Sequence, residues 1–538
     1  MTPLPVTARE SKFAALRTPV DVLVIGGGVN GLAIAWDAAL AGRRVVVVDK
    51  GDWGSGTSSW SSRMIHGGLK YLEKYDVRLV RESLRDREWL LRNASHLVQP
   101  LPFLLPFYRG NAHSAAALRA GMIAYDVLSF DKSVPWHRTF SRDALLERLP
   151  GLAPENLQGG ARYYDAQVEY AERLCVELML AARNAGALTL NHTRASELTL
   201  SNGTTVTGAT LVDELTGTRH QVEAALTINV SGAWADTVLA GTPADERRWI
   251  GGTKGTHLVV DRFPGAPDDA MYYESVDARP MMVIPWLGRY LLGSTDKHVD
   301  GDLDTIAPDA AEVAYILYET NRVLPCANLT HADVHYGYTG VRPLPYVGSG
   351  KTADISRRHE IHDHAPQVEG LLSVIGGKLT TFRALAAHAC RVISTKIGPT
   401  PSTLGLHRLP GALTRDRITG ETGRTRAIYG GRSPQLLELA GAEPRLAHPL
   451  DEEVIAAEVA FAVRREEAVH LADVMARRIM TALRPDLGRS LAEPVAEVMA
   501  AELGWDDDQR EREIAEYHRY LERFAVPEPD PAFRPGQQ

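Results

Sequence analysis

The chain has 538 residues, of which 44% are hydrophobic and 23% are charged, and its formal net charge is −8. This length exceeds what one hydrophobic core needs, so two or three domains of an ordinary globular enzyme are expected. The negative net charge argues against a general nucleic-acid-binding protein, which needs a basic face.

No targeting or membrane-spanning segment is recognisable. The first twenty residues mix charged and apolar positions, so the apolar core of a signal peptide cannot form. The most apolar helical stretch, Ser114–Phe130, is interrupted by Arg119 and Asp126, so a transmembrane span is not expected. The three cysteines are widely separated, which excludes a disulfide framework and favours a reducing cytoplasm. Contact with a membrane surface remains open.

The chain is organised around a strand–turn–helix–strand unit near its start. The apolar run Val22–Ile25 predicts a buried parallel strand, Leu32–Leu40 a helix, and Val45–Val48 a second buried strand. The turn before the helix has the pattern G-x-G-x-x-G, with its glycines at Gly26, Gly28 and Gly31. A dinucleotide-binding unit is predicted because all of these parts occur in the required order.

Each residue of this pattern has a physical task. Gly26 permits the tight turn, Gly28 lets the backbone approach a pyrophosphate, and Gly31 lets helix and strand pack closely. The helix N-terminus offers free N–H groups to phosphates, and Asp49 lies where a carboxylate can accept hydrogen bonds from a ribose. NAD and FAD both fit the pattern, and glycines that serve packing alone are the alternative.

The next stretch is rich in glycine and serine. Trp53, Trp60 and Met64 are interleaved with these residues, which argues against a flexible linker. Its hydroxyl groups suit hydrogen bonds to phosphates or a flavin ring. A long charged helix is expected at Val77–Ser95, and the prolines of Pro100–Pro106 suggest a crossing into a second domain.

The middle of the chain alternates helices and strands. Further helices are predicted at Ala115–Phe130, Arg142–Arg148, Val168–Asn184 and Ala310–Leu324. Hairpins are expected around Asn202-Gly203 and Thr216-Gly217. Single strands are expected at Gly160–Tyr164, Leu226–Val230, Thr256–Val260, Met281–Trp286, Tyr290–Asp296 and Leu371–Ile375, the last followed by a helix through Ile393.

Past Pro401 the sequence has few strand formers. Helices are predicted at Glu452–Leu483, Leu491–Leu503 and Asp508–Phe524. We therefore expect a discontinuous dinucleotide-binding domain over residues 18–400, interleaved with a substrate-binding cap at about 100–160 and 250–345. A separate helical domain over 405–525 and a Pro-rich tail over 526–538 would follow.

Five ordered motifs carry a resemblance that covers nearly the whole chain. They are TSSWSSRMIHGGLKYLE from Thr57, NVSGAWAD from Asn229, GTHLVV from Gly255, YTGVRPL from Tyr338 and LLSVIGGKLTTFR from Leu371. With the opening fingerprint, they resemble the FAD-dependent glycerol-3-phosphate dehydrogenases of respiration. The resemblance implies an α/β fold, with a Rossmann-like FAD-binding domain, an antiparallel-sheet substrate domain and a C-terminal all-helical domain.

The resemblance also implies an activity. FAD would take a hydride from sn-glycerol 3-phosphate, giving dihydroxyacetone phosphate, and electrons would pass to a quinone. The enzyme would be cytoplasmic, peripherally attached to the inner face of the cell membrane, and a homodimer is conceivable. The cofactor contacts implied are Gly26, Gly28, Asn30, Gly31, Asp49, Thr57, Ser58, Ser61, Ser62, His66, Gly67, Gly232, Trp234, Gly377 and Thr380. For His66, a purely structural imidazole is the alternative.

The substrate site is likewise carried over from the motifs. Arg342 is implied as a pocket arginine with a catalytic role. His257 is the candidate general base, because an imidazole of near-neutral pKa accepts a proton at little cost, and a strand histidine bonded to backbone is the alternative. The other implied substrate contacts are Lys70, Tyr71, Arg357, Lys378 and Thr381. Arg and Lys suit a dianionic phosphate. Arg358 lies beside Arg357, so that match can slip by one residue.

One residue departs from the family pattern. Lys70 stands where an arginine is expected, which keeps the charge but loses the planar two-pronged donor and puts substrate choice in question. The histidines near His359–His364, and the pair His331 and His335, lack a closed set of metal ligands, so no metal site is assigned. Arg464-Arg465 and Arg477-Arg478 are expected on one long helix, either as a solvated face or as a face that meets a membrane surface or a partner.

Three alternatives stay open. An oxidase that passes electrons to oxygen would have a similar active site. An amine or hydroxy-acid oxidase would keep the fold but need only one arginine for a carboxylate, whereas this chain offers a richer set of cations. A non-enzymatic flavin-binding partner protein is the third, because fold alone does not give function.

Overall fold

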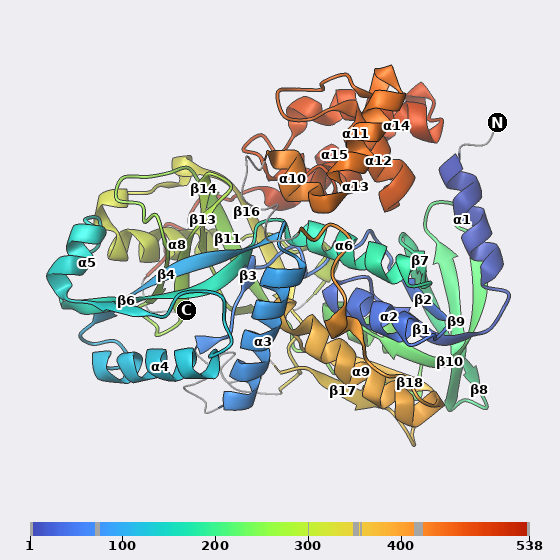
Figure 1. The fold of residues 1–538 in the computed structure, drawn as a ribbon, viewed down its shortest axis with the longest axis horizontal. Coiled ribbons are helices and arrows are strands. Elements are labelled where there is room, and N and C mark those ends of the chain that lie inside the picture. The colour runs from blue at the N-terminus through green and yellow to red at the C-terminus, as the bar shows by residue number, and fades with distance from the viewer. Residues whose placement is uncertain are drawn as a thin grey trace.

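The computed structural model describes residues 4–69, 76–299, 301–347, 355, 358–413 and 423–534. Figure 1 shows three parts: one sheet with helices α2, α6 and α9, a second sheet that carries α4, α5 and α8, and a helical domain above both. None of the described helices has the length and apolar character needed to cross a membrane.

The first sheet is built on the predicted parallel strands. Its order is β17-β18-β10-β1-β2-β7, and β1, β2, β7, β10 and β18 run parallel. Val24 of β1 faces Val47 of β2 on one side and Ile228 of β10 on the other. The strands are β1 Val20–Ile25, β2 Val45–Val48, β7 Leu188–Leu190, β10 Arg219–Asn229, β17 Glu360–Asp363 and β18 Leu371–Ile375.

Helices cover this sheet because its strands are apolar on both faces. α2 packs between α6 and α9, and these helices span Val29–Leu40, Ala171–Asn184 and Phe382–Ile397. Both predicted hairpins are present, since β8 (Thr193–Ser201) pairs with β9 (Thr205–Asp213), and β9 pairs with β10. The short helix α7, Ala235–Leu239, follows β10.

The second sheet has ten strands and is mostly antiparallel, as predicted for the substrate domain. Its path is β15-β11-β14-β13-β12-β4-β6-β3, with β16 beside β11 and β5 beside β6. In chain order they are β3 Met64–Ile65, β4 Val98–Tyr108, β5 Arg138–Phe140, β6 Leu157–Val168, β11 Thr253–Val260, β12 Ala270–Glu274, β13 Pro280–Trp286, β14 Arg289–Gly293, β15 Lys297–His298 and β16 Val334–Arg342.

Strand β4 corrects one prediction. Pro100, Pro102 and Pro106 were expected to mark a crossing into a second domain. The chain does enter the second sheet here, but the prolines lie inside a strand that pairs along its length with β6. The prolines occupy alternate positions. Because every second residue of an antiparallel strand donates its N–H to a given neighbour, the residues between them can maintain the pairing.

Capped helices surround the second sheet. Asp76 caps α3 (Val77–Asn93), Ser114 caps α4 (Ala115–Leu128), and Ser141 caps α5 (Arg142–Arg148), each by accepting a backbone N–H. Asp309 forms a capping box at the start of α8, Ala310–Val323. These helices agree with the predictions to within two residues at each end.

The C-terminal helical domain is confirmed, but its predicted long helix is wrong. Residues 452–483 form two helices, because Glu467 adopts a left-handed φ of 61° and ends the first of them. The helices are α10 Arg424–Tyr429, α11 Ser433–Ala442, α12 Ala456–Glu466, α13 Leu471–Arg477, α14 Ala492–Leu503 and α15 Asp507–Leu521. An N-terminal helix, α1 (Leu4–Ala15), packs against α12 and α14.

Candidate active site

A cavity of about 610 Å³ opens at the carboxyl ends of β1 and β2, where the glycine turn begins. The predicted cofactor residues that line it are Gly26, Gly28, Asn30, Asp49, Thr57, Ser58, Ser61, His66, Gly232, Trp234 and Gly377. They come from segments far apart in the chain, so the fold brings most of the predicted set into one hollow. Ligands of open parallel sheets bind at this edge.

The glycine turn has the geometry that the pattern predicts. Gly26 has a φ of 119°, which disfavours any residue with a side chain. Gly31 does not line the cavity but packs on the backbone of Gly26, where a Cβ would overlap the carbonyl oxygen. Gly28 is the N-cap of α2, so the first turn of that helix points its N–H groups toward the hollow.

Asp49 lines the cavity and also holds the turn. Its Oδ2 accepts the N–H of Gly27 at 2.6 Å and its Oδ1 accepts that of Gly51 at 2.8 Å. Burial raises the pKa of Asp49, although these backbone N–H groups oppose the rise. The predicted ribose contact therefore comes from a carboxylate that is already held in place.

The serine-rich segment lies against the second sheet. Thr57 donates to the carbonyl of Val341 at 2.6 Å, and Ser58 accepts the N–H of Val29 at 3.0 Å. The carbonyl of Ser61 accepts the hydroxyl of Tyr338 at 2.8 Å. These bonds exclude a linker role for the segment and join the two sheets across the cavity.

Arg342 and Lys378 bring two cations to the same cavity from different elements. Arg342 ends β16, and its guanidinium donates to Asp296 Oδ1 at 3.1 Å and Ser294 Oγ at 3.0 Å. It lies so close to Gly255 that a Cβ there would overlap it. Lys378 Nζ donates to Ser83 Oγ at 2.6 Å. Both predicted cations therefore line the same cavity.

His257 lies beside the cavity rather than on its wall. Its side chain is buried, Nε2 lies 2.8 Å from Ser62 Oγ, and the ring stacks on Tyr338. Burial, reinforced by the charges of Arg342 and Arg63, lowers the pKa of His257 to about 3. The imidazole is therefore neutral, and the near-neutral pKa expected for a general base is wrong, because the ring is buried beside two arginines. Nε2 contacts a side-chain hydroxyl and not the backbone.

The remaining predicted residues support the wall or fall elsewhere. Thr380 accepts the N–H of His66 at 3.2 Å, Gly67 donates to Asp165 at 3.2 Å, and Thr381 is buried at the start of α9. Three predicted substrate contacts lie outside the described residues: Lys70, Tyr71 and Arg357.

The cavity has lining residues that the sequence did not point to. They are Lys50, the start of β8 from Thr193 to Ser196, Leu303, Asp304 and Arg523. The position of Lys50 directly after Asp49 was a usable signal. Nothing local in the sequence marks Arg523, which lies in the helical domain more than 490 residues after the glycine turn.

Comparisons with known proteins agree with this architecture. A family model described as "FAD dependent oxidoreductase" matches residues 21–383, and one described as "C-terminal domain of alpha-glycerophosphate oxidase" matches residues 421–510. The glycerol-3-phosphate dehydrogenase of Synechocystis is 41% identical, covering 95% of this chain and 98% of the relative. The chain belongs to the FAD-dependent glycerol-3-phosphate dehydrogenase family.

Other relatives extend the comparison. Glycerol-3-phosphate dehydrogenase 2 of Mycobacterium tuberculosis is 36% identical, covering 95% of this chain and 89% of its own. The structure of the glycerol-3-phosphate dehydrogenase from Bacillus halodurans complexed with FAD has a TM-score of 0.78 at 26% identity and covers 98% of both chains. Glycine oxidase from Geobacillus kaustophilus, with a TM-score of 0.53 at 21% identity, shows the fold alone.

The cavity of this family member fits FAD on its own chemistry. Asn30 Oδ1 and Trp234 Nε1 are buried without a hydrogen-bond partner among the described residues, and both residues line the hollow. Unpaired buried polar atoms are costly, so a polar ligand is expected there. With the glycine turn and the N-terminus of α2, they form a cradle for a dinucleotide.

Proposed function

We propose that this enzyme oxidises sn-glycerol 3-phosphate to dihydroxyacetone phosphate and that its electrons pass to a quinone. The observation that carries the substrate proposal is that Arg342 and Lys378 both line the cavity that fits FAD. FAD, when bound, supplies the hydride acceptor. The names of the Synechocystis and Bacillus halodurans relatives support the same substrate.

The two cations have distinct tasks in this proposal. The planar guanidinium of Arg342 lines the cavity and is held by five protein acceptors. The ammonium of Lys378 provides a point charge on a single flexible stem. Together they bind and orient a dianionic phosphate ester, and Lys70, Tyr71, Arg357 and Thr381 complete the proposed substrate site.

Oxidation of the alcohol also requires removal of the hydroxyl proton. His257 is the proposed acceptor because of its place in the GTHLVV motif. Its imidazole is neutral and Nδ1 is buried without a partner among the described residues, but a pKa of about 3 makes the ring a weak base. A neutral ring nitrogen can take a proton, whereas an imidazolium cannot. Ser62, bonded to Nε2, fixes the orientation of the ring.

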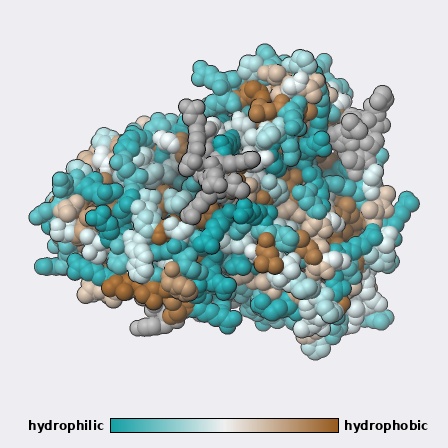
Figure 2. All heavy atoms as spheres, in the orientation of Figure 1, coloured by the Kyte–Doolittle hydropathy of each residue, from teal (hydrophilic) through white to brown (hydrophobic). Residues whose placement is uncertain are grey.

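A membrane-bound acceptor is supported by the surface of α4. Four large apolar side chains on and after this helix are between 56% and 73% exposed: Ile123, Val127, Phe130 and Trp136. Figure 2 shows apolar side chains gathered along the edge of the molecule where Figure 1 places α4. Arg81 lies over the ring of Phe130 and Lys132 over that of Trp136.

An exposed apolar helix face suits the interface of a bilayer, and the two cations beside it are paired with Asp131 and Asp126. We therefore place α4 against the inner face of the cell membrane, where a quinone dissolved in the lipid would be the acceptor. Helix α4 is also linked to the cavity wall, since Tyr125 donates to Asp165 at 2.7 Å and Asp165 accepts the N–H of Gly67.

The deciding experiment is an anaerobic titration of the purified flavoprotein with glycerol 3-phosphate, followed by flavin absorbance. We expect complete bleaching by glycerol 3-phosphate and none by glycerol or by an amino acid. Rapid reoxidation by a soluble quinone analogue, with little hydrogen peroxide formed in air, would support the quinone. Bleaching by glycine or by a hydroxy acid alone would contradict the proposal, and fast peroxide formation would identify an oxidase.

A further inference from the structure

The loop that follows β2 lies between the glycine turn and the helical domain. Gly54 donates its N–H to the carbonyl of Gly27 at 2.9 Å, and a Cβ at Gly27 would overlap the ring of Trp53. On the other side, Trp53 Nε1 donates to Glu467 Oε2 at 3.1 Å. The loop therefore links the helical domain to the turn that would hold the cofactor phosphates.

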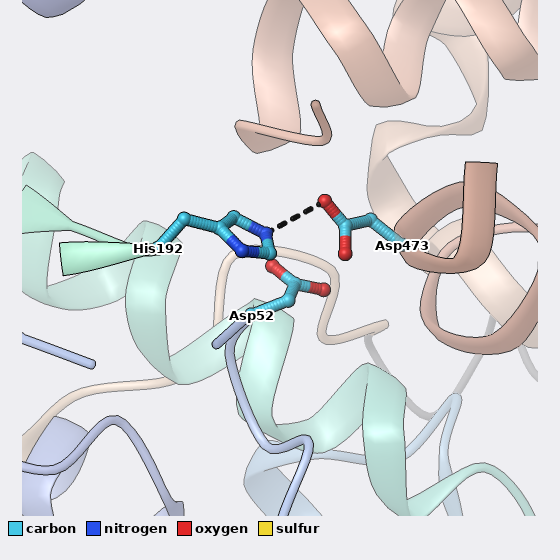
Figure 3. A group of neighbouring side chains, drawn as sticks. All are labelled: Asp52, His192 and Asp473. Carbon is cyan, nitrogen blue, oxygen red and sulfur yellow. Dashed lines mark hydrogen bonds and ion pairs between the residues drawn. The ribbon is translucent and has the colours of Figure 1, made fainter. Parts of the chain in front are cut away.

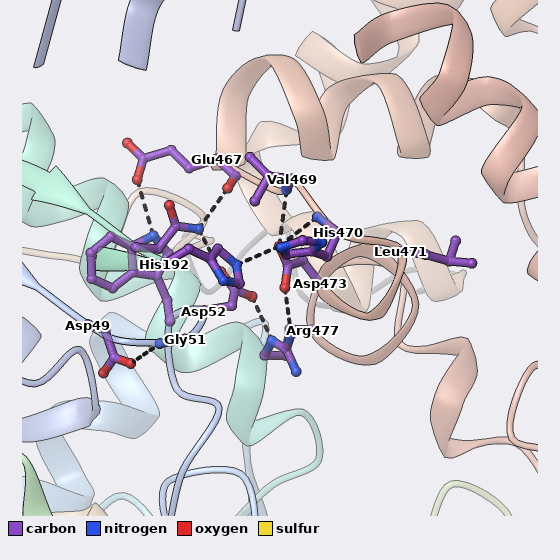
Figure 4. A network of polar contacts seen from close by, with 12 residues as sticks. Asp49, Gly51, Asp52, His192, Glu467, Val469, His470, Leu471, Asp473 and Arg477 are labelled. Carbon is purple, nitrogen blue, oxygen red and sulfur yellow. Dashed lines mark hydrogen bonds and ion pairs between the residues drawn. The ribbon is translucent and has the colours of Figure 1, made fainter. Parts of the chain in front are cut away.

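Asp52 fixes the same loop through two buried ion pairs. Its Oδ2 accepts from Arg477 Nε at 2.6 Å and from Arg478 Nη1 at 2.7 Å, and all three side chains are at most 5% exposed. Burial alone would raise the pKa of Asp52, but the charges of Arg478 and Arg477 outweigh it and lower the pKa. Figure 4 shows this network extending from Asp49 and Gly51 to the helical domain. The expectation of a solvated or membrane-facing position for Arg477-Arg478 is thus wrong.

The group of Asp52, His192 and Asp473, drawn in Figure 3, has the spacing of a metal site. Its oxygens already have protein donors, however. Asp473 accepts from His192 at 2.9 Å, from Arg477 at 2.7 Å and from the backbone N–H groups of Val469 and His470 at 3.0 Å. Two guanidinium groups supply the positive charge, so this cluster is an ion-pair network that joins two parts of the fold.

The helical domain also reaches the cavity directly. Arg523 follows α15 and lines the same hollow as the glycine turn. Its guanidinium lies 5.0 Å from the ring centroid of Trp60 and 5.4 Å from that of Tyr520. Phe524 packs on Trp60 and Tyr336, which anchors this position. Trp60 in turn donates to the carbonyl of Ser55, another lining residue.

Arg523 differs from Lys50, Arg194 and Arg342, three other cations that line the cavity. Lys50 is paired with Asp304, Arg194 with Glu214, and Arg342 with Asp296. Within the described part of the chain, no carboxylate lies within ion-pair distance of Arg523, whose recorded contacts are two aromatic faces. A guanidinium placed between rings is oriented but keeps its N–H groups available for an anion.

We propose that the C-terminal helical domain completes the cofactor site, with Arg523 binding the diphosphate of FAD and Asp52 transmitting the position of the domain to the glycine turn. Arg523 is then a cofactor-binding residue, and Arg477 and Arg478 are positioning residues. This inference rests on FAD occupying the cavity and does not depend on which alcohol is oxidised.

Direct titration of the apoprotein with FAD, followed by quenching of flavin fluorescence, tests the proposal. Arg523→Gln removes the charge, and Arg523→Met also preserves apolar cover over Trp60. We expect both variants to raise the Kd for FAD about tenfold or more, as for loss of one charge-assisted hydrogen bond. Arg519→Gln, one turn earlier on α15 and exposed, is the matched control and should stay within twofold of the parent.

A second measurement distinguishes a role of Arg523 in binding FAD from a role in binding the substrate. With FAD saturating, the KM for glycerol 3-phosphate should be unchanged in both Arg523 variants, and the FAD-induced rise in thermal midpoint should be smaller than in the parent. The proposal is overturned if both variants bind FAD within twofold of the parent. A raised KM with an unchanged Kd for FAD would also overturn it, since Arg523 would then serve the substrate.

Discussion

The Nε2 atom of His257 lies 2.8 Å from the hydroxyl oxygen of Ser62, while Nδ1 of the same ring has no partner among the described residues. This asymmetry leaves one ring nitrogen engaged and one available. Because burial and two arginine charges lower the pKa of His257 to about 3, the ring stays neutral from mildly acidic to alkaline pH. The ring is then unprotonated over the whole working range, although a pKa this low makes it a weak base.

His257→Gln should lower kcat by roughly 10²–10⁴-fold, the usual effect of losing a general base. FAD binding should be unchanged, since His257 does not line the cavity. Steady-state kinetics across pH provide the measurement, and the parent should show no loss of kcat near pH 6.5 from this group. His335→Gln, on an exposed position of β16, is the control. An unchanged kcat in His257→Gln would show that His257 does not accept the hydroxyl proton.

Arg342→Ala and Lys378→Ala should each raise the concentration of glycerol 3-phosphate needed for half-maximal bleaching by about 10–100-fold. Each removes one charged donor to the phosphate, and the protein should remain yellow. Lys396→Ala, at the far end of α9, removes a lysine that pairs with Asp363 and should have little effect. Loss of flavin from either cavity variant would instead assign that residue to the cofactor.

Arg478→Met should destabilise the protein by about 3–5 kcal/mol, because it leaves the buried Asp52 with one partner fewer. Thermal unfolding followed by circular dichroism measures the change. Arg465→Met is the control, since Arg465 is exposed at the end of α12. An equal loss of stability in Arg478→Met and Arg465→Met would show that the ion pair between Arg478 and Asp52 does not stabilise the fold.

Sequence reasoning succeeded where the determinants are local. The strand, glycine turn and helix from Val20 to Leu40 follow from spacing alone, and the structure places them as predicted. Arg342 and Lys378 were found through family motifs, because no periodicity links residues of separate elements. The prolines of β4 were misread as loop residues. Their alternate spacing is compatible with a strand, but this becomes clear only when β6 is known as the pairing partner.

The helical domain shows the limit of such reasoning. Arg477 and Arg478 resemble an ordinary basic doublet until the fold brings Asp52 to them across more than 420 residues. Arg523 has no neighbouring motif, and its place in the cavity depends on how the short turn after α15, Glu522–Phe524, packs against β16 of the second sheet. Burial of charge is a property of tertiary contacts, and a single sequence does not contain them explicitly.

His470 should make stability depend on alkaline pH. Burial lowers its pKa, but the hydrogen bond to Glu513 and the nearby carboxylates of Asp473 and Glu516 outweigh burial and raise it to about 9. A folded pKa above the unfolded value of about 6.5 means that the stabilisation is complete below pH 6.5 and is lost as pH rises through 9.

His470→Gln should therefore flatten the decline in thermal midpoint between pH 6.5 and pH 9. Thermal midpoints measured across this range for the parent and the variant give the comparison. His518→Gln, on the exposed side of α15, should retain the decline. If the thermal midpoint of His470→Gln falls as much as that of the parent, the pH dependence comes from other titratable groups.

The apolar surface of α4 predicts binding to lipid vesicles that contain anionic phospholipid. Replacing Ile123 and Phe130 together by Asp should reduce co-sedimentation with such vesicles by at least tenfold, because each large apolar side chain withdrawn from lipid costs about 1.5–3 kcal/mol. Leu437→Asp, at a 60% exposed leucine on α11 of the helical domain, is the matched control. Turnover with a soluble dye should be equal in all three proteins, whereas turnover with a quinone embedded in vesicles should fall only in the α4 variant. Equal vesicle binding by the parent and the α4 variant would show that another surface meets the membrane.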